Sequence, residues 1–154
     1  MGHDITLASF RWRRYPLKWG GIFIKLYRHG TLAKEECQHV QIRCRVDACE
    51  LPELIPLSSQ TRHNVMMTVK EALHNVIKHA RASEVTVRVV FDGKWLDISI
   101  TDNGCGFLSA TPSSGNGFVN MNRRIRDIGG TCQVESQPGE GASVRLRLSI
   151  YPKD

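Results

Sequence analysis

Hydrophobic residues recur with helical spacing between residues 65 and 80. The positions are separated by three or four residues, and they are Val65, Val69, Leu73, Val76, Ile77 and Ala80. Residues spaced in this way lie on one face of a helix, which they supply with an apolar stripe. Ser58 and Ser59 stand upstream, and either hydroxyl suits a helix N-cap. The pattern predicts one long helix from this cap to Ala80.

Five other stretches alternate between apolar and polar residues, which is the period of a strand with one buried face. They are "VQIRCRV" (40–46), "SEVTVRVVFD" (83–92), "WLDISITD" (95–102), "TCQVESQ" (131–137) and "ASVRLRLSIY" (142–151). The short "GK" turn after Asp92 joins the second and third stretches into a hairpin.

Two further helices complete the expected order of elements. "TLAKEECQH" (31–39) has the pattern of a helix end, and "FVNMNRRIRDIG" (118–129) stops at Gly129-Gly130, a common helix terminator. Helices and strands in this order predict an α+β fold. We expect a two-layer α/β sandwich, with a mixed sheet whose helices cover one face.

The bulk composition is that of a globular domain. The chain has 154 residues, of which 41% are hydrophobic and 23% charged, enough for one domain with a core. The net charge of +6 comes from residues 9–30, which contain basic residues and no acid, while the rest of the chain is balanced. We therefore predict a basic aromatic extension over 1–34, a domain over 35–154 and no nucleic-acid binding by the domain.

The role of the extension stays open between a docking segment, a membrane-surface segment and a poorly ordered leader. No run of 18 apolar residues predicts a membrane span, and no secretory signal is recognisable. Five cysteines without a CxxC pair argue against a disulfide framework and against a zinc site. These features favour reduced thiols and a cytoplasmic location.

A polar stripe runs beside the apolar stripe of the long helix. Glu71, Asn75 and His79 recur every four residues, with Lys78 next to them. A carboxylate and an amide on one helix face can share a hard cation such as Mg²⁺, and a lysine can face phosphate. The same stripe also fits an ordinary solvated face, so alone it decides nothing.

Two glycine-rich segments follow the hairpin. Asp102 ends a strand and is followed by Gly104 and Gly106, while Gly115 and Gly117 precede a helix. Glycines let a backbone approach a ligand closely, and a helix N-terminus favours phosphate. Taken alone, "DNG" is more typical of an ordinary turn, and the second segment is a weak signal as well.

The three motifs together resemble a known family. "EALHNVIKHA" resembles the N box, "DNGCGF" the G1 box and "GNGFVNMNRRIRDIGG" the G2 region of the Bergerat-type (GHKL) ATPase fold. The residues of these motifs are most similar to those of catalytic domains of nitrate-sensor-type histidine kinases. "VESQPGEGASVRLRLSI" resembles the closing strand pair of these domains, so the resemblance covers about residues 35–150.

The resemblance implies a role for each residue of the helical stripe. Glu71 would be the acid/base or water-orienting carboxylate. Asn75 would bind Mg²⁺, and Lys78 and His79 would lie near the phosphates of ATP.

It also implies roles for the glycine-rich segments. Asp102 would accept a hydrogen bond from the adenine amine, and residues 107–117 would form a lid. Gly104 and Gly106 would shape the adenine pocket. Gly115 and Gly117 would close on the phosphates.

The chain departs from the family pattern in two places. Where the family usually has Gly-Thr, this chain has Gly141-Ala142, so a hydroxyl near the adenine is missing. Ser143 is one residue away, and an offset of one turns a side chain to the other face of a strand. We also expect residues 1–34 to be too few for the helical hairpin that bears the phospho-accepting histidine in this family, and we do not expect His3-Asp4, near the N-terminus, to take that role.

The resemblance therefore implies a catalytic domain of a two-component sensor histidine kinase. It would transfer the γ-phosphoryl group of ATP to a histidine of a separate dimerisation domain, which in turn serves a response regulator. Two alternatives stay open at this point: a nucleotide-binding regulatory module without turnover, and an anti-sigma-type serine kinase of the same fold.

Overall fold

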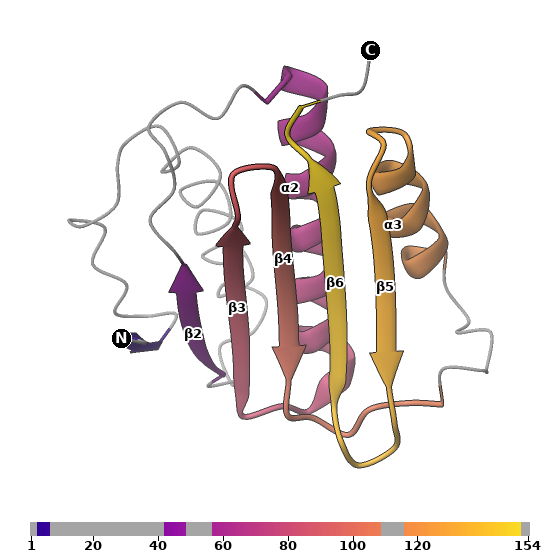
Figure 1. The fold of residues 1–154 in the computed structure, drawn as a ribbon. Coiled ribbons are helices and arrows are strands. Elements are labelled where there is room, and N and C mark those ends of the chain that lie inside the picture. The colour runs from indigo at the N-terminus through magenta and orange to yellow at the C-terminus, as the bar shows by residue number, and fades with distance from the viewer. Residues whose placement is uncertain (1–2, 7–41, 49–56, 109–115, 152–154) are drawn as a thin grey trace.

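The computed structural model of the chain describes residues 3–6, 42–48, 57–108 and 116–151 (Figure 1). The elements in chain order are β1 (His3–Thr6), β2 (Arg43–Ala48), α2 (Ser59–Asn75), a π-helical turn η2 (Val76–Ala80), β3 (Glu84–Phe91), β4 (Trp95–Asp102), α3 (Gly117–Arg126), β5 (Thr131–Ser136) and β6 (Ala142–Ser149).

One mixed sheet contains all six strands, in the order β1-β2-β3-β4-β6-β5. β2 and β3 are parallel, and every other neighbouring pair is antiparallel. A parallel pair needs a crossover connection, and α2 lies in the connection between β2 and β3. Figure 1 shows α2 and α3 on the same face of the sheet. The predicted α+β sandwich is confirmed.

The core lies between that face and the helices. Alternate residues of the central strands point into it and are at most 7% exposed: Val85, Val87, Val89, Leu96, Ile98, Ile100, Val144, Leu146 and Leu148. The helices add Val65, Val69, Ala72 and Val76 from α2 and η2, and Met121 and Ile125 from α3. Burial of this apolar surface is the main source of stability.

The opposite face of the sheet carries charged side chains in cross-strand pairs. Arg88 lies 2.9 Å from Asp47, Arg145 lies 3.6 Å from Glu135, and Arg147 lies 3.7 Å from Asp97. The side chains of these pairs are between 39% and 62% exposed, so each contributes at most about 1 kcal/mol. The face of the sheet that packs against the helices therefore supplies most of the stability, whereas the outer face is exposed to solvent.

The sequence pattern predicted most element boundaries. Ser58 is the N-cap of α2, and its hydroxyl accepts a hydrogen bond from the backbone N–H of Thr61 at 3.0 Å. The helix continues to Ala80 as predicted, but its last turn is π-helical rather than α-helical. The strand predicted at 40–46 corresponds to β2, which the structure places at Arg43–Ala48.

The expected helix at 31–39 and the boundary between 34 and 35 lie outside the described residues. From the predicted extension, His3–Thr6 pairs with β2 as an edge strand. No helix in the described part of the chain is both long and apolar enough to cross a lipid bilayer.

Three cysteines lie within the described residues, and all three are free thiols. Burial raises the pKa of Cys44 and of Cys132 to about 11, so both stay protonated and unreactive at neutral pH. Cys105 is exposed. Cys37 and Cys49 lie outside the described residues.

One buried amide fixes α3 against α2. Asn64 is 4% exposed, and its Nδ2 donates a hydrogen bond to the backbone carbonyl of Arg124 at 2.8 Å. That carbonyl is among the last four of α3, which have no partner of the usual kind within a helix. The oxygen of the same amide is also bonded, because Gln60 Nε2 donates a hydrogen bond to Asn64 Oδ1 at 2.9 Å. Asn64 therefore sets where α3 lies along α2.

Replacing Asn64 tests this link. We expect Asn64→Leu to lower the free energy of unfolding by about 1–3 kcal/mol, because the Arg124 carbonyl loses its donor. Denaturant unfolding followed by circular dichroism measures the change. Gln60→Ala is the comparison, since it leaves the bond to Arg124 in place and removes an exposed side chain, so that water can reach Asn64 Oδ1, and it should cost less than Asn64→Leu. Equal losses in the two variants would contradict a special role of Asn64.

Candidate functional site

The site begins at the π-helical turn that ends the α2 segment. Arg81 follows it in the left-handed conformation, with φ of 52°. Cys105 donates two hydrogen bonds to this turn. Its backbone N–H donates to the Ala80 carbonyl at 2.7 Å, and its thiol donates to the His79 carbonyl at 3.4 Å. The loop after β4 thus supplies donors to the helix end, and Lys78 and His79 stay exposed there. Single π turns of this kind occur often at functional sites.

Three backbone segments cross beside this turn, and a glycine stands at each crossing. A Cβ on Gly104 would lie 2.1 Å from the Ala80 carbonyl oxygen. One on Gly106 would lie 2.0 Å from the Gln137 oxygen, and one on Gly141 would lie 2.1 Å from the Asp102 oxygen. No side chain fits in such spaces, so these glycines bring the helix end, the loop after β4 and the β5–β6 turn together.

Asp102 lies at the centre of this crossing. It is 6% exposed, and its Oδ1 accepts a hydrogen bond from the Gly104 backbone N–H at 2.8 Å. Among the described residues no donor reaches Oδ2. One carboxylate oxygen therefore shapes the loop, while the other can accept a hydrogen bond from a ligand.

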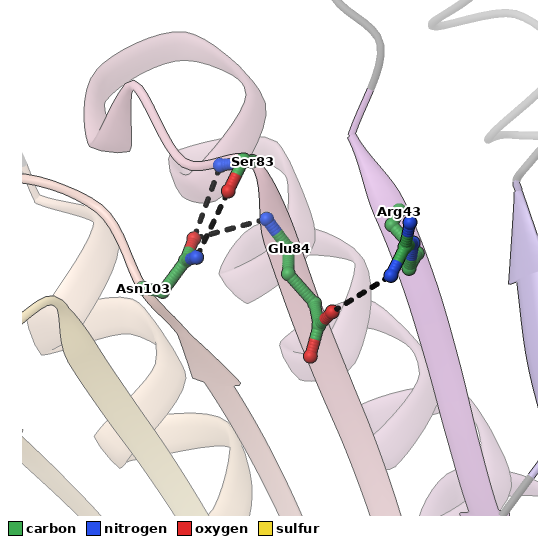
Figure 2. A network of polar contacts seen from close by, with 4 residues as sticks. All are labelled: Arg43, Ser83, Glu84 and Asn103. Carbon is green, nitrogen blue, oxygen red and sulfur yellow. Dashed lines mark hydrogen bonds and ion pairs between the residues drawn. The ribbon is translucent and has the colours of Figure 1, made fainter.

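Asn103 has a structural role that is distinct from that of its neighbour Asp102. Figure 2 shows its Oδ1 accepting from the backbone N–H groups of Ser83 at 3.0 Å and Glu84 at 2.9 Å. Its Nδ2 donates to the Ser83 hydroxyl at 2.9 Å, and Glu84 lies 3.8 Å from Arg43 of β2. Asn103 thus fastens the loop after β4 to the beginning of β3. The turn interpretation of "DNG" therefore fits Asn103, while the ligand-binding role of Asp102 stays a prediction.

The beginning of α3 lies against the polar stripe of α2. A Cβ on Gly117 would be 2.9 Å from Glu71 Oε1 and 3.9 Å from Asn75 Nδ2. Asn116, the N-cap, makes no capping hydrogen bond through its side chain. Free N–H groups at a helix N-terminus attract anions such as phosphate. The structure therefore brings Glu71, Asn75 and Gly117 together, while Gly115 lies outside the described residues.

Two phenylalanines join the ends of the segment predicted to be a lid. The rings of Phe107 and Phe118 stack with centroids 5.3 Å apart. Ser136 holds the first of them, because its hydroxyl accepts from the Phe107 backbone N–H at 2.8 Å and donates to the Gly141 carbonyl at 2.7 Å. The base of this segment is thereby tied both to α3 and to the β5–β6 turn.

The strand register decides which hydroxyl groups lie near position 142, where this chain has alanine in place of the usual threonine. The Ser143 hydroxyl lies 3.0 Å from that of Thr101, which is exposed, whereas Asp102 is buried on the other face. Ser143 therefore cannot replace a hydroxyl at Ala142. Ser136 pairs directly with Ala142 across the strands. Sequence reasoning did not single out Ser136. Its only signal in the sequence is that it ends the strand before the "PGEG" turn, while Ala142 begins the strand after it.

Comparison with known proteins assigns the family. Residues 60–152 match the family described as histidine kinase-, DNA gyrase B- and HSP90-like ATPase. The chain is 32% identical to the sensor histidine kinase LiaS of Bacillus subtilis over 99 residues, which are 64% of this chain and 28% of LiaS. It is 35% identical to the nitrate/nitrite sensor protein NarX of Escherichia coli K12 over 94 residues, which are 60% of this chain and 15% of NarX.

The chain thus spans less than a third of either relative. Solved structures share the fold. The histidine kinase domain of the Erythrobacter litoralis EL346 blue-light activated kinase has a TM-score of 0.67 at 23% identity, covering 84% of this chain and 61% of that one. The Acinetobacter baumannii histidine kinase AdeS has a TM-score of 0.69 at 14% identity, covering 99% and 68%.

The predicted resemblance to sensor histidine kinase ATPase domains is confirmed by these matches. The chain belongs to the histidine kinase-, DNA gyrase B- and HSP90-like ATPase family.

Proposed function

We propose that this chain binds ATP with Mg²⁺ and is the catalytic domain of a two-component sensor histidine kinase. The observation that carries the proposal is that Gly117 lies beside Glu71 and Asn75, so close that an added Cβ would meet both side chains, which brings the G2 region to the N box. Gly104 and Ala80 join the G1 box to the same helix. Three motifs that are weak one by one thus converge at one end of α2.

The adenine would lie at the glycine crossing. Asp102 Oδ2 can accept a hydrogen bond from the exocyclic amine, while Oδ1 stays bonded to Gly104. Gly104 and Gly106 keep the backbone close enough to shape a flat pocket, since a side chain on either would collide with main-chain oxygens. A buried carboxylate of this kind favours a base that carries an amine over one that presents a carbonyl.

The phosphates would lie toward the beginning of α3. Its N-terminus, Gly115 and Gly117 would approach them from one side, and Lys78 and His79 from the exposed end of η2. Asn75 supplies an amide oxygen for Mg²⁺, which prefers a few protein oxygens together with phosphates and water. The residues present therefore fit a magnesium ion held jointly by protein and nucleotide.

Glu71 would act on the group that attacks the γ-phosphorus. Its carboxylate lies beside the start of α3, where it can take a proton from the attacking group or orient it. The histidine nitrogen forms the new N–P bond, the bond from phosphorus to the β–γ bridging oxygen breaks, and ADP leaves. Positioning and charge neutralisation supply most of the rate enhancement in such transfers.

The acceptor histidine would belong to a dimerisation domain on a partner chain or in a part of the protein outside this sequence. From that domain the phosphoryl group would pass to a response regulator. We place this reaction in the cytoplasm, where ATP is available. The short share of LiaS and NarX that the chain matches agrees with a catalytic domain that works together with other domains.

Two variants separate the two ends of the nucleotide site. Asp102→Asn keeps an oxygen for Gly104 and replaces the ligand-facing oxygen with an amide NH₂ group, which donates instead of accepting, so ATP affinity should fall at least about tenfold with or without Mg²⁺. Asn75→Ala should weaken ATP binding only when Mg²⁺ is present. Calorimetric titration measures both. Arg88→Ala, on the outer face of the sheet, is the control. Unchanged affinity in both variants would mean that the site is misassigned.

Restoring a hydroxyl at position 142 tests the departure from the family pattern. We expect Ala142→Thr to tighten ATP binding by up to about tenfold, the gain of roughly one hydrogen bond. Ser143→Ala removes the hydroxyl of the next residue in the chain, which lies on the face of the sheet opposite to Asp102, and should leave the affinity unchanged. A loss of affinity in Ser143→Ala would show that the outer face takes part in nucleotide binding.

Phosphoryl transfer can be measured in trans. With labelled ATP and a dimerisation domain that bears an acceptor histidine, the wild-type chain should label that histidine. Glu71→Gln should bind ATP normally but transfer at least about 100-fold more slowly, as expected for loss of a general base. Tight Mg-ATP binding without transfer to any acceptor histidine would instead favour a regulatory module without turnover.

A further inference from the structure

Gly117 occupies a position where its own backbone does not require glycine. It begins α3, and it is not among the glycines with positive φ, which are Gly93, Gly106, Gly129, Gly139 and Gly141. In a helix glycine is less favourable than alanine because its backbone loses more conformational freedom on folding. The reason for glycine must therefore lie in what surrounds it.

The nearest surrounding atom is a carboxylate oxygen. An added Cβ would lie 2.9 Å from Glu71 Oε1, then 3.8 Å from Glu71 Cδ and 3.9 Å from Asn75 Nδ2. The first distance is too short for a carbon and an oxygen that are not bonded, so one of the two must move. This differs from Gly104, where the neighbouring atoms belong to the Ala80 backbone and its Cβ.

The helix that carries Gly117 is held at both ends and along its length. Asn64 binds the Arg124 carbonyl near its C-terminus, and Phe118 stacks on Phe107 near its N-terminus. Met121 and Ile125 of the same helix are fully buried. The flexible side chain of Glu71 is therefore the part that would yield to a methyl group at position 117.

We propose that Gly117 is a positioning residue for Glu71: by lacking a side chain, it leaves the carboxylate in place at the beginning of α3. The contact itself rests only on the geometry of α2 and α3. Its consequence for phosphoryl transfer rests on the proposed function. The competing explanation is that Gly117 lacks a side chain only so that phosphates can approach the helix.

A stability cycle tests the contact without any assay of activity. Gly117→Ala is introduced into the wild type and into Glu71→Ala, and thermal unfolding is measured for all four proteins. Helix propensity predicts a rise in Tm when alanine replaces glycine in a helix. We expect that rise to be larger in the Glu71→Ala background, where no carboxylate has to move. Equal shifts in the two backgrounds would overturn the proposal.

The functional consequence is a split between turnover and affinity. In Gly117→Ala, turnover, measured as transfer of the labelled phosphoryl group to an acceptor histidine supplied in trans, should fall at least about tenfold while the Kd for ATP changes by less than about threefold. A Kd that weakens about tenfold or more both in the wild type and in Glu71→Ala would overturn the proposal in favour of phosphate approach. Unchanged turnover and Kd would overturn it as well.

Val119→Ala is the matched control. Val119 lies in the same helical turn, is 67% exposed, and gains helix propensity without adding bulk. It should leave turnover and Kd unchanged. If the wild-type chain fails to bind ATP, the proposed function fails, and the stability cycle still decides whether Gly117 and Glu71 are in contact.

Discussion

The arrangement of the whole site depends on backbone contact at three glycines. Gly104, Gly106 and Gly141 let the helix end, the loop after β4 and the β5–β6 turn approach to distances that exclude a Cβ. Because of this approach, the loop after β4 can donate hydrogen bonds to the last carbonyls of η2, and Asp102 is buried with one oxygen committed. A methyl group at Gly104 would push the N box away from the G1 box, and one at Gly106 or Gly141 would push the loop after β4 away from the β5–β6 turn.

A second constraint positions the phosphate end. The apolar face shared by α2, α3 and the sheet fixes the two helices in the core, and Asn64 sets how α3 lies along α2. The stacked Phe107 and Phe118 then bring the beginning of α3 to the polar stripe. The core therefore places Glu71 opposite Gly117, and the chemistry of the site follows from the packing.

The sequence predicted those features that depend on local period and local chemistry. Alternation predicted β3 to β6, the cap at Ser58 was found, and three motifs indicated the family. It could not predict the π-helical turn or the role of Ser136, because these depend on contacts between segments far apart in the chain. For the same reason the glycines at 115 and 117 indicated a helix N-terminus suited to phosphate, but they did not indicate that Gly117 lies beside Glu71.

The central claim is that a nucleotide binds where the glycine crossing meets the beginning of α3. Backbone amide chemical shifts of the ¹⁵N-labelled chain, titrated with ADP and Mg²⁺, test it directly. The account predicts saturable shifts at Gly104, Gly106 and Gly117, with little change at Gly93 and Gly129. Shifts concentrated on the outer face of the sheet, around Ser99 and Arg145, with none at the three glycines, would contradict it.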